Sequence, residues 1–384
     1  MSDAKMPVTR QRRRWPRILL AVLVGLAAVA VAAFELYRPA PRVLRNGGEP
    51  MQAIVYHDYG PPEVLRLEVI DRPVPKDSQV LIEVHASSVN PVDWHYMRGD
   101  PYVIRLEEGL HRPDDPQLGT DLAGVVVAVG RSVTRFKPGD EVFGVGPGAF
   151  AQFARASEKR LALKPAGLSF EQAAAFPVAA VTALQGLRDS GRMKAGQKVL
   201  INGASGGVGT FAVQIARAYG AEVTGVCSTR NVELVRSLGA ARVIDYTSED
   251  FTRGDTRYDV ILDTVGNRSL SDIRRVMTRT GVYVGIGGGG PADGGLIGPL
   301  AGMLKELVVS PFVSQELATF TAQITSADLG VLSDLVAAQK LSPVIDRTYA
   351  LKDAAQAVHY LEQGHARGKV IIMVAAAQAR QDPQ

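Results

Sequence analysis

The sequence has very little cysteine and almost no net charge outside its N-terminus. Cys227 is the only cysteine among 384 residues, which excludes an intramolecular disulfide framework and a cysteine-rich structural zinc site. Residues 1–17 contain six basic residues and one acidic residue, so this tail has a net charge of +5 and the rest of the chain one of −1. A surface suited to nucleic acid is therefore not expected outside the tail. With 46% hydrophobic and 21% charged residues, the chain has the composition of a globular protein of about two domains, and disorder and coiled coil are disfavoured.

The sequence also has only one long hydrophobic run. Residues 18–34 are 17 consecutive residues without a charged or strongly polar side chain, and at about 1.5 Å per residue they reach the short end of a membrane span. Trp15 and Tyr37 stand where interfacial aromatic residues are common. The pattern predicts three N-terminal segments, namely a basic tail over 1–17, a membrane-spanning helix over 18–37 and a linker over 38–50.

The predicted helix implies a single-pass membrane protein with an N-terminal anchor. The side of the membrane stays open, because local charge counts decide little when a long domain follows the span. A cleaved signal peptide and a buried core helix are the alternatives for the same residues.

After residue 50 the pattern changes to short β-favouring runs separated by turns, which predicts a compact, mostly β unit. These runs are 53–56, 80–84, 123–129 and 141–145. From residue 169 strands and helices alternate, which predicts an α/β fold with a parallel sheet covered by helices on both faces. The expected helices are 169–187 (apart from Pro177), 210–219, 231–238 and 270–278, and the expected strands are 198–201, 222–226, 242–244, 259–262 and 282–285.

A strand, a glycine-rich turn and the start of a helix follow one another between Lys198 and Thr210. The spacing Gly-x-x-Gly-x-x-Gly lets the backbone turn tightly and approach a pyrophosphate, and the N-terminus of the following helix offers free N–H groups to the phosphates. A P-loop needs a lysine before its hydroxyl residue, but here Gly209 precedes Thr210. The turn therefore predicts a dinucleotide site formed by Gly203, Ser205, Gly206, Gly207, Val208 and Gly209.

The second strand of this unit lacks the acidic residue that usually binds the ribose hydroxyls of NAD. It ends instead in Ser228, Thr229 and Arg230. Small hydroxyl groups and an arginine suit a 2′-phosphate, so the sequence predicts NADP(H) in preference to NAD(H), bound through Ser228 and Arg230. The alternative is that Arg230 is a solvated charge at the start of the next helix.

Six sequence motifs together resemble the medium-chain dehydrogenase/reductase superfamily. They are YGPPEVL (59–65), SVNPVD (88–93), GTDLAGVV (119–126), FKPGDEVFG (136–144), the glycine turn and VIDY (243–246). Within that superfamily the chain is similar to the zinc-free quinone oxidoreductases, the zeta-crystallin-like branch, whose bacterial members are often described as NAD(P)-dependent alcohol dehydrogenases. The resemblance extends from Met51 to about Val374.

The resemblance implies a GroES-like β domain in two sequence pieces, with a Rossmann domain inserted between them and the active site in the cleft. The implied segments are a first catalytic piece over 51–172, a Rossmann NADP-binding domain over 173–312, a second catalytic piece over 313–376 and a flexible tail over 377–384. A homodimer is compatible with the resemblance. Because the family's chain normally begins near Met51, a translation start there is a further alternative, and it would make the protein cytoplasmic.

Zinc alcohol dehydrogenases share this implied fold and polarise the substrate oxygen on a metal ion held by cysteine and histidine. Here residues 90–93 stand where a segment led by a zinc-binding cysteine would be. Thr120 and Asp121 stand where His-Glu would be, and the four-cysteine structural lobe is missing. The sequence therefore predicts no metal site.

Without zinc, the oxygen that gains charge during hydride transfer needs hydrogen-bond donors or a proton from the protein. The resemblance implies that Asn90 lines the substrate cleft. His95, with Tyr96 beside it, falls where relatives often place a tyrosine near the substrate, so these three are the candidate catalytic residues. Packing is the alternative for His95 and Tyr96, and helix capping is the alternative for Asp93.

Two further residues, Thr182 and Tyr246, are cofactor candidates by the same resemblance, and Lys369 is considered beside them. Thr182 matches a position near the nicotinamide, and Tyr246 matches one near the adenosine 2′-phosphate; a core or strand-end role is the alternative for both. Lys369 could reach a phosphate, but a solvated charge before a terminal strand is the favoured interpretation.

These features predict an NADPH-dependent reductase that transfers hydride to a quinone or an α,β-unsaturated carbonyl compound. A zinc-free alcohol or carbonyl oxidoreductase is the nearest alternative, and a nonenzymatic membrane-tethered NADPH-binding protein is the alternative from another class. The expected partners are a small carbonyl or quinone substrate and, through the N-terminal helix, a membrane.

Overall fold

The structure, a computed structural model, describes residues 44–286 and 315–374 of the chain. All of them belong to one compact unit, Val43–Gln384. The predicted basic tail (1–17), membrane-spanning helix (18–37) and C-terminal tail (377–384) lie outside the described residues.

A seven-stranded sheet forms the β domain. In spatial order its strands are β14 (Ile345–Ala350), β15 (Lys369–Met373), β3 (Gln79–Val89), β4 (Asp121–Val129), β5 (Glu141–Val145) and β7 (Leu161–Leu163), and β6 (Phe153–Ser157) pairs with β3. The C-terminal strand β15 runs antiparallel to β3, with Val370 opposite Val89. The domain is thus assembled from two distant sequence pieces, as the resemblance implied. A separate antiparallel pair, β1 (Pro50–Val55) and β2 (Arg66–Asp71), precedes it.

A six-stranded parallel sheet forms the second domain. In spatial order its strands are β10 (Arg242–Asp245), β9 (Glu222–Cys227), β8 (Lys198–Asn202), β11 (Tyr258–Asp263), β12 (Met277–Gly285) and β13 (Glu316–Thr319). Numbered along the chain, this is the order 3-2-1-4-5-6 of a Rossmann fold. The predicted α/β fold with GroES-like and Rossmann domains is therefore confirmed. The last strand, β13, pairs with β12 although it follows residue 312, where the Rossmann segment was expected to end.

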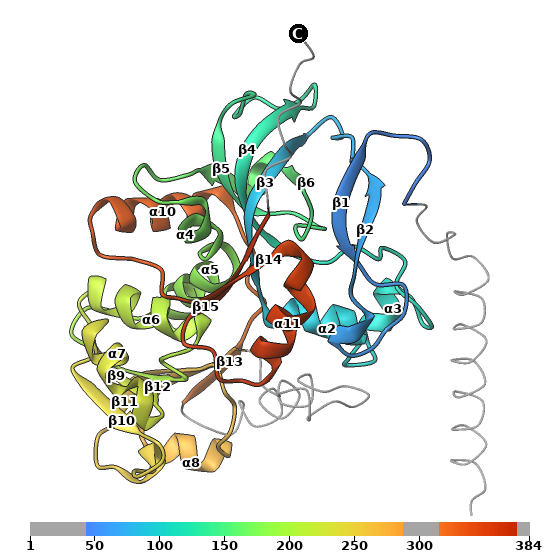
Figure 1. Cartoon of the computed structure of the whole chain (residues 1–384). Helices are drawn as coiled ribbons and strands as arrows, with labels where there is room; N and C mark the ends of the chain where they lie inside the picture. The colour runs from blue at the N-terminus through green and yellow to red at the C-terminus, as the bar shows by residue number, and fades with distance from the viewer. Residues whose placement is uncertain (1–43, 287–314, 375–384) are drawn as a thin grey trace, which may run out of the picture. The chain divides into compact units, whose positions relative to one another are not determined.

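Helices cover both sheets. They are α2 (Pro91–Arg98), α3 (Ile104–Glu108), α4 (Phe170–Ala174), α5 (Pro177–Gln185), α6 (Gly207–Ala218), α7 (Val232–Ser237), α8 (Leu270–Arg275), α10 (Ser326–Ala337) and α11 (Ala354–Glu362). Short 3-10 turns occupy Pro62–Val64, Glu158–Arg160, Thr229–Asn231, Phe251–Arg253 and Leu351–Asp353, and a π-helical turn occupies Gly186–Ser190. Figure 1 shows α4, α5 and α6 between the strands of the two sheets.

The segment 169–187, expected to be helical apart from Pro177, forms two helices, because Pro177 cannot continue a helix but is well suited to its first turn. Ser169 caps α4: its Oγ accepts a hydrogen bond from the N–H of Gln172 at 3.2 Å. Nearly every side chain of α5 is buried. This short, all-round apolar helix is therefore held on every side by the two domains rather than lying on the surface.

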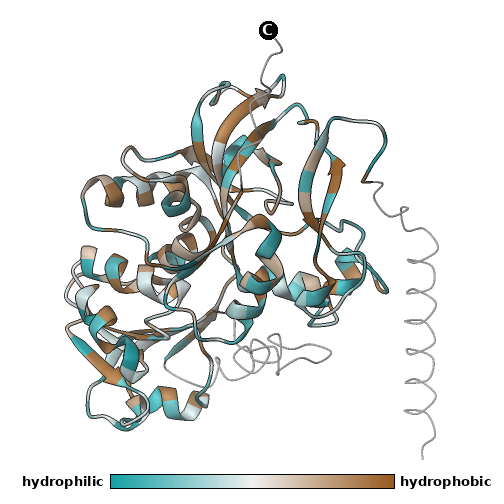
Figure 2. Ribbon diagram, in the orientation of Figure 1, coloured by the Kyte–Doolittle hydropathy of each residue, from teal (hydrophilic) through white to brown (hydrophobic). Residues whose placement is uncertain are grey.

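One apolar core joins the two domains. The ring of Phe176, just before α5, lies 6.4 Å from that of Phe143 on β5 and 5.0 Å from that of Phe211 on α6. All three side chains are buried. Hydrophobic residues concentrate on the strands and on the helix faces that meet them (Figure 2), so the junction between the domains is packed like a protein interior.

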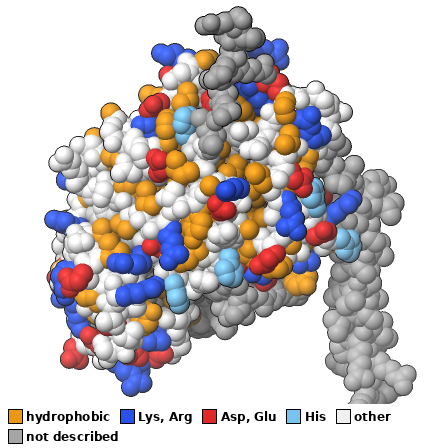
Figure 3. All heavy atoms as spheres, viewed as in Figure 1, with side chains coloured by type: hydrophobic (Ala, Val, Ile, Leu, Met, Phe, Trp, Pro, Cys, Tyr) orange, Lys and Arg blue, Asp and Glu red, His pale blue; other side chains and the backbone are white. Residues whose placement is uncertain are grey.

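Basic and acidic side chains are interspersed on the face of the molecule seen in Figure 3. Among the described residues several basic and acidic side chains form ion pairs, for example Arg98 with Glu362 at 2.6 Å.

The predicted membrane-spanning helix is corrected. Among the residues described, no helix is long and apolar enough to cross a membrane. The longest of these helices, α6 and α10, have 12 residues each, or about 18 Å, whereas a bilayer core is about 30 Å thick. The membrane-spanning helix is therefore withdrawn from the fold, together with the membrane localisation and the membrane partner that depended on it.

Candidate functional site

The glycine turn connects β8 to α6, and its geometry requires residues without a side chain at two positions. Gly203 has φ of +84°, and a Cβ there would lie 2.3 Å from the Oγ1 of Thr264. A Cβ on Gly209 would lie 2.1 Å from the backbone oxygen of Gly203. Only glycine fits these two positions, so the turn brings the N-terminus of α6 close to the end of β8, the geometry in which helix N–H groups bind phosphate.

Asn231, which the sequence analysis overlooked, ties this turn to the end of β9. Its Nδ2 donates to the Oγ of Ser205 at 3.0 Å and to the Oγ of Ser228 at 3.2 Å. The side chain is buried, and its Oδ1 has no hydrogen-bond partner. Ser205 and Ser228, both predicted cofactor residues, are thus brought together. A buried acceptor without a donor fits a site completed by a ligand with hydroxyl groups.

Arg230 and Tyr246 follow the carboxyl ends of the neighbouring strands β9 and β10, beside the contact of Asn231 with the glycine turn. Arg230 is exposed and donates from Nη2 to the backbone oxygen of His365 at 2.7 Å. Tyr246 is 53% exposed, and its N–H donates to the backbone oxygen of Cys227 at 3.1 Å. Both side chains are free to meet a ligand from solvent at the edge where a Rossmann domain binds the adenosine.

Asp245 is an acidic residue in the same region that the sequence analysis did not weigh. Its Oδ1 accepts hydrogen bonds from the N–H and the hydroxyl of Thr247, at 3.0 and 2.8 Å. Hydrogen bonds from Thr229 and Thr247 lower the pKa of Asp245. The carboxylate of Asp245 therefore stabilises the turn that follows β10.

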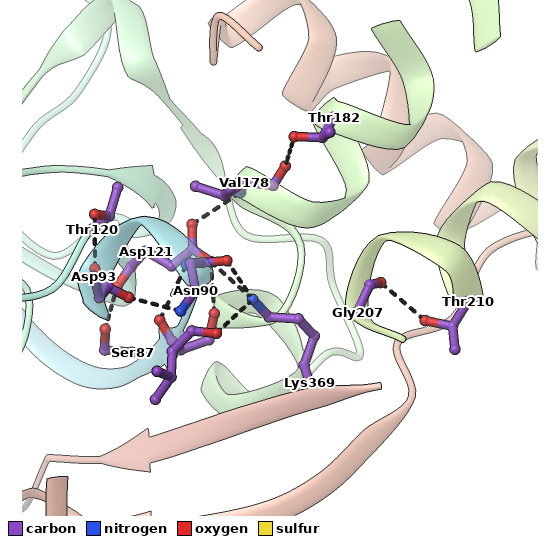
Figure 4. Close-up of polar contacts among 12 residues, drawn as sticks. Ser87, Asn90, Asp93, Thr120, Asp121, Val178, Thr182, Gly207, Thr210 and Lys369 are labelled. Atoms are coloured by element: carbon purple, nitrogen blue, oxygen red, sulfur yellow. Dashed lines mark hydrogen bonds and ion pairs between the residues drawn. The ribbon is translucent and has the colours of Figure 1, made fainter. Parts of the chain in front are cut away.

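A second, buried polar cluster lies where α2, β4, α5 and β15 meet (Figure 4), and we call it the junction network. Its centre is Asp121, which is fully buried. Asp121 accepts hydrogen bonds from the Ser88 hydroxyl at 2.6 Å, from Asn90 Nδ2 at 2.8 Å and from the N–H of Val178, in the first turn of α5, at 2.9 Å. Three donors, one of them at the N-terminus of a helix, therefore converge on this one carboxyl group.

Lys369 supplies the positive charge of the junction network. Its ammonium group donates to Asn90 Oδ1 at 2.7 Å and to the backbone oxygen of Val89 at 3.2 Å, and it lies 3.5 Å from Asp121 Oδ2. The residue is only 3% exposed, so the favoured interpretation of Lys369 as a solvated charge is wrong. Burial lowers its pKa, and Asp121 opposes that shift.

Lys369 also touches the glycine turn. A Cβ placed on Gly207 would lie 3.2 Å from Lys369 Cδ, and the preceding Gly368 forms an isolated β-bridge with Gly206. The stem of one side chain therefore packs against the expected pyrophosphate site while its charged end enters the junction network. The nucleotide turn and the polar cluster are adjacent in the structure, although their residues are far apart in the sequence.

Asn90, the first catalytic candidate, is 1% exposed and fully engaged within this network. Its Oδ1 accepts from Lys369, and its Nδ2 donates to Asp121 and, at 3.3 Å, to the backbone oxygen of Ser88. Both amide hydrogens are thus used by the protein. The geometry makes Asn90 the connection between Lys369 and Asp121, and its direct contact with substrate stays a prediction.

Asp93 caps α2 and is 1% exposed. Its Oδ2 accepts the N–H of Asn90 at 2.7 Å, and its Oδ1 accepts the hydroxyl of Thr120 at 3.1 Å. Burial raises the pKa of Asp93 to about 7; the Asn90 N–H opposes this rise and Asp121 adds to it. Asp93 therefore exchanges a proton near neutral pH, which neither its sequence position nor the helix-capping interpretation indicated.

His95 and Tyr96 lie further along α2. The Nδ1 of His95 donates to the backbone oxygen of Asp100 at 2.6 Å, its ring lies 3.7 Å from that of Trp94, and burial lowers its pKa. Tyr96 is partly buried, and burial raises its pKa. Neither side chain has a hydrogen bond to the junction network, so their roles stay predictions.

Thr182, the expected nicotinamide contact, lies on α5 one turn after Val178. Its hydroxyl donates to the backbone oxygen of Val178 at 2.7 Å (Figure 4), and the side chain is 8% exposed. One helix therefore carries both the N–H that holds Asp121 and the candidate nicotinamide contact.

Within 44–286 and 315–374, no group of three or more His, Cys, Asp or Glu side chains could hold a metal ion. Asn90 and Thr120, which stand at the positions of zinc ligands in zinc alcohol dehydrogenases, are hydrogen-bonded to Lys369 and Asp93 instead.

Two known families match the chain. Residues 76–166 match "Alcohol dehydrogenase GroES-like domain", and residues 238–372 match "Zinc-binding dehydrogenase". The second name refers to zinc, but in this chain Asn90 and Thr120 stand at the expected zinc-ligand positions.

Similar proteins cover nearly the whole chain after its N-terminal segment. "Quinone oxidoreductase" of Mus musculus is 34% identical in an alignment of 345 positions that covers 86% of this chain and 100% of that protein. "NADPH-dependent alkenal/one oxidoreductase, chloroplastic" of Arabidopsis thaliana is 35% identical over 84% of this chain and 79% of that protein. The crystal structure of Escherichia coli quinone oxidoreductase complexed with NADPH superposes with a TM-score of 0.72, at 27% identity over 84% of this chain and 99% of that one.

Proposed function

Because this chain belongs to the medium-chain dehydrogenase/reductase superfamily and is an NAD(P)H-dependent oxidoreductase, we propose that it transfers hydride from NADPH to a quinone or an α,β-unsaturated carbonyl compound. The names of two relatives give these two substrate classes, and a small molecule of this kind suits a site at a domain junction.

The residues of the glycine turn and of the β9 end fit a dinucleotide. Gly203 and Gly209 allow the close approach of backbone to phosphate, and the buried Oδ1 of Asn231 is an acceptor that a ribose hydroxyl would satisfy. Arg230 is the cation nearest in sequence to the end of β9, and its exposed guanidinium supports a preference for the 2′-phosphate of NADPH.

One observation carries the proposal, namely the contact of Lys369 with both regions. Its stem packs against Gly207, and its ammonium lies 2.7 Å from Asn90 Oδ1. A dinucleotide held on the turn therefore extends toward a polar cluster that contains a lysine, two carboxyl groups and a threonine hydroxyl. When bound, the nicotinamide supplies the hydride.

The protein's own part in the reaction is to position the substrate, to exclude water and to manage charge. The buried core around Phe176 fixes the two domains relative to each other in the described unit. The negative charge of Asp121 and the positive charge of Lys369 largely cancel. The junction network therefore presents fixed hydrogen-bonding groups to the site with little net charge.

A substrate screen tests the proposal. The full-length protein is mixed with NADPH or NADH and with a quinone, a cyclic enone, the matching saturated ketone and an aldehyde, and loss of reduced nicotinamide is followed by absorbance. We expect oxidation of NADPH with the quinone or the enone and none with the saturated ketone. Turnover of the saturated ketone or the aldehyde alone would instead establish a carbonyl reductase.

A further inference from the structure

We infer that Asp93 and Thr120 form the proton-delivery pair of this site: Thr120 donates its hydroxyl proton to the reduced substrate, and Asp93 replaces that proton. The inference rests on the proposed function, because it concerns the proton that follows the hydride.

Thr120 is the member of the cluster that reaches the surface of the site. It is partly exposed, whereas Asp93, Asn90 and Asp121 are each at most 1% exposed. Thr120 and Asp93 lie together at one end of the junction network, and Lys369 enters at the other end, beside the glycine turn (Figure 4). Because the carboxyl group of Asp93 is enclosed and Thr120 is partly exposed, the hydroxyl of Thr120 is the member of this pair that a substrate can contact.

Asn90, the donor favoured by its sequence position, has no hydrogen to give. Its two amide hydrogens are bound to Asp121 Oδ2 and to the backbone oxygen of Ser88. An amide is also a very weak acid, so it could stabilise charge but not supply a proton. Thr120 is bound by its side chain only to Asp93 Oδ1, and that bond can be reversed.

The charges around Asp93 favour a proton on it. The ionisable groups that face Asp93 are Asp121 from β4 and Lys369 from β15. Two buried carboxyl groups share one ammonium group, and Lys369 lies against Asp121, which also has three hydrogen-bond donors. Because a second uncompensated anion is costly in this interior, the proton resides on Asp93, and its pKa is raised to about 7.

The protonation state of Asp93 sets the direction of the hydroxyl of Thr120. The Oδ2 atom of Asp93 accepts the N–H of Asn90, so the acid proton belongs on Oδ1, which faces Thr120 at 3.1 Å. A protonated Oδ1 donates to the Thr120 oxygen, and the Thr120 hydrogen must then point elsewhere. When Asp93 is neutral, the hydroxyl hydrogen of Thr120 is available to the substrate. When Asp93 is ionised, that hydrogen is bound to the Asp93 carboxylate instead.

The chemical step balances with NADPH as the reductant. Hydride adds to the β-carbon of an enone, the C=C electron pair moves to the α-carbon and carbonyl oxygen, and an enolate forms. The α-carbon takes the proton of the Thr120 hydroxyl as the O–H bond breaks, and the proton of Asp93 moves to the Thr120 oxygen. The products are the saturated ketone, NADP⁺ and ionised Asp93, which takes up a proton from water before the next turnover.

Three variants test the inference in the full-length protein with NADPH and a cyclic enone. Asp93→Asn keeps the shape and the hydrogen bonds of the neutral acid but has no proton to transfer. Thr120→Val removes the hydroxyl, and Thr120→Ser is the matched control that keeps it. We expect kcat to fall about 100-fold or more in Asp93→Asn and Thr120→Val and to stay within about threefold in Thr120→Ser.

Two readouts separate proton delivery from a structural role. In the unmodified protein kcat should decrease above about pH 7, as Asp93 loses its proton, and this decrease should vanish in Asp93→Asn. With an α-substituted enone in D₂O, the unmodified protein should place deuterium on one face of the α-carbon, and Thr120→Val should lose this selectivity. NADPH affinity should stay within about twofold in all three variants, which shows that each has folded.

Each outcome decides a separate claim. Unchanged kcat and unchanged facial selectivity in Asp93→Asn and Thr120→Val, while the unmodified protein reduces the enone, would overturn the proton-delivery pair and leave the proposed function in place. If the unmodified protein reduces neither enones nor quinones, the proposed function fails and the pair fails with it.

Discussion

The glycine turn and the junction network differ in how the sequence encodes them. The turn is one continuous segment, residues 198–210, and its geometry depends on absent side chains at Gly203 and Gly209. The junction network takes its side chains from segments near residues 90, 120 and 369, and its geometry depends on charges removed from water. The comparison teaches that a site made of backbone can be found in a short motif, whereas a site made of buried charge exists only after folding.

The two regions should therefore fail differently when they are altered. A change in the junction network should cost stability first, because an unpaired buried charge is expensive. A change in the glycine turn should cost cofactor affinity first, because the turn carries no charge and makes its contacts through the backbone.

The largest expected effect is on stability, from Lys369→Met. Removal of the ammonium group leaves Asp121 buried without a cation, which should lower the free energy of unfolding by about 3–5 kcal/mol, as measured by urea denaturation. The double variant Lys369→Met/Asp121→Asn removes both charges and should recover a large part of this loss. A double variant no more stable than Lys369→Met would show that the ion pair is not the reason.

The pH dependence of stability should show the raised pKa of Asp93 directly. Because the folded protein binds this proton more tightly than the unfolded chain, the free energy of unfolding should fall as pH rises from about 4 to about 7 and then level off. The contribution is on the order of 4 kcal/mol over that range. Asp93→Asn should remove it in urea titrations at several pH values, and an identical slope in the variant would contradict the assignment.

Gly209→Ala should act on the turn. Its Cβ would lie 2.1 Å from the backbone oxygen of Gly203, so the turn must shift, at a cost of about 1–3 kcal/mol. We expect NADPH affinity to fall about 5- to 150-fold by fluorescence titration, which is that cost converted to a ratio of dissociation constants. Gly254→Ala is the matched control, because a Cβ on Gly254 meets nothing within 4 Å, and it should bind NADPH normally.

The smallest effect should come from Arg230→Ala, since this side chain is exposed. If Arg230 meets the 2′-phosphate, NADPH affinity should fall roughly tenfold, and NADH affinity should be almost unchanged. Lys352→Ala removes an exposed positive charge outside the Rossmann domain and controls for the loss of net charge. Equal losses for NADPH and NADH would move the phosphate contact to another residue.

The sequence predicted much of the fold and of the glycine turn. The parallel sheet, the β domain and its assembly from two sequence pieces were all expected. The alternation of strands and helices and the family motifs are local patterns, so they can be recognised in the sequence without knowledge of the folded structure. The break at Pro177 between α4 and α5 was also visible as a residue that cannot lie inside a helix. The membrane-spanning helix was wrong, since no helix of the described residues is long and apolar enough to cross a membrane.

The chemistry of the junction network could not be predicted in the same way. Lys369 was expected to be solvated because a lysine before a strand usually is, and only the pairing of β15 with β3 places it beside Asp121. Asp93 had the spacing of a helix cap, and its raised pKa comes from burial and from Asp121, which lies on strand β4. Asn231 was missed although it follows Arg230 directly, and a search for polar residues in that first helical turn would have found it.

The most direct test of the central claim, hydride transfer to a carbon–carbon double bond, is the position of a label. The full-length protein is given NADPH deuterated at C4 of the nicotinamide and a cyclic enone, and the product is analysed by NMR and mass spectrometry. The account predicts a saturated ketone with one deuterium on the β-carbon. An allylic alcohol with deuterium on the former carbonyl carbon would contradict it.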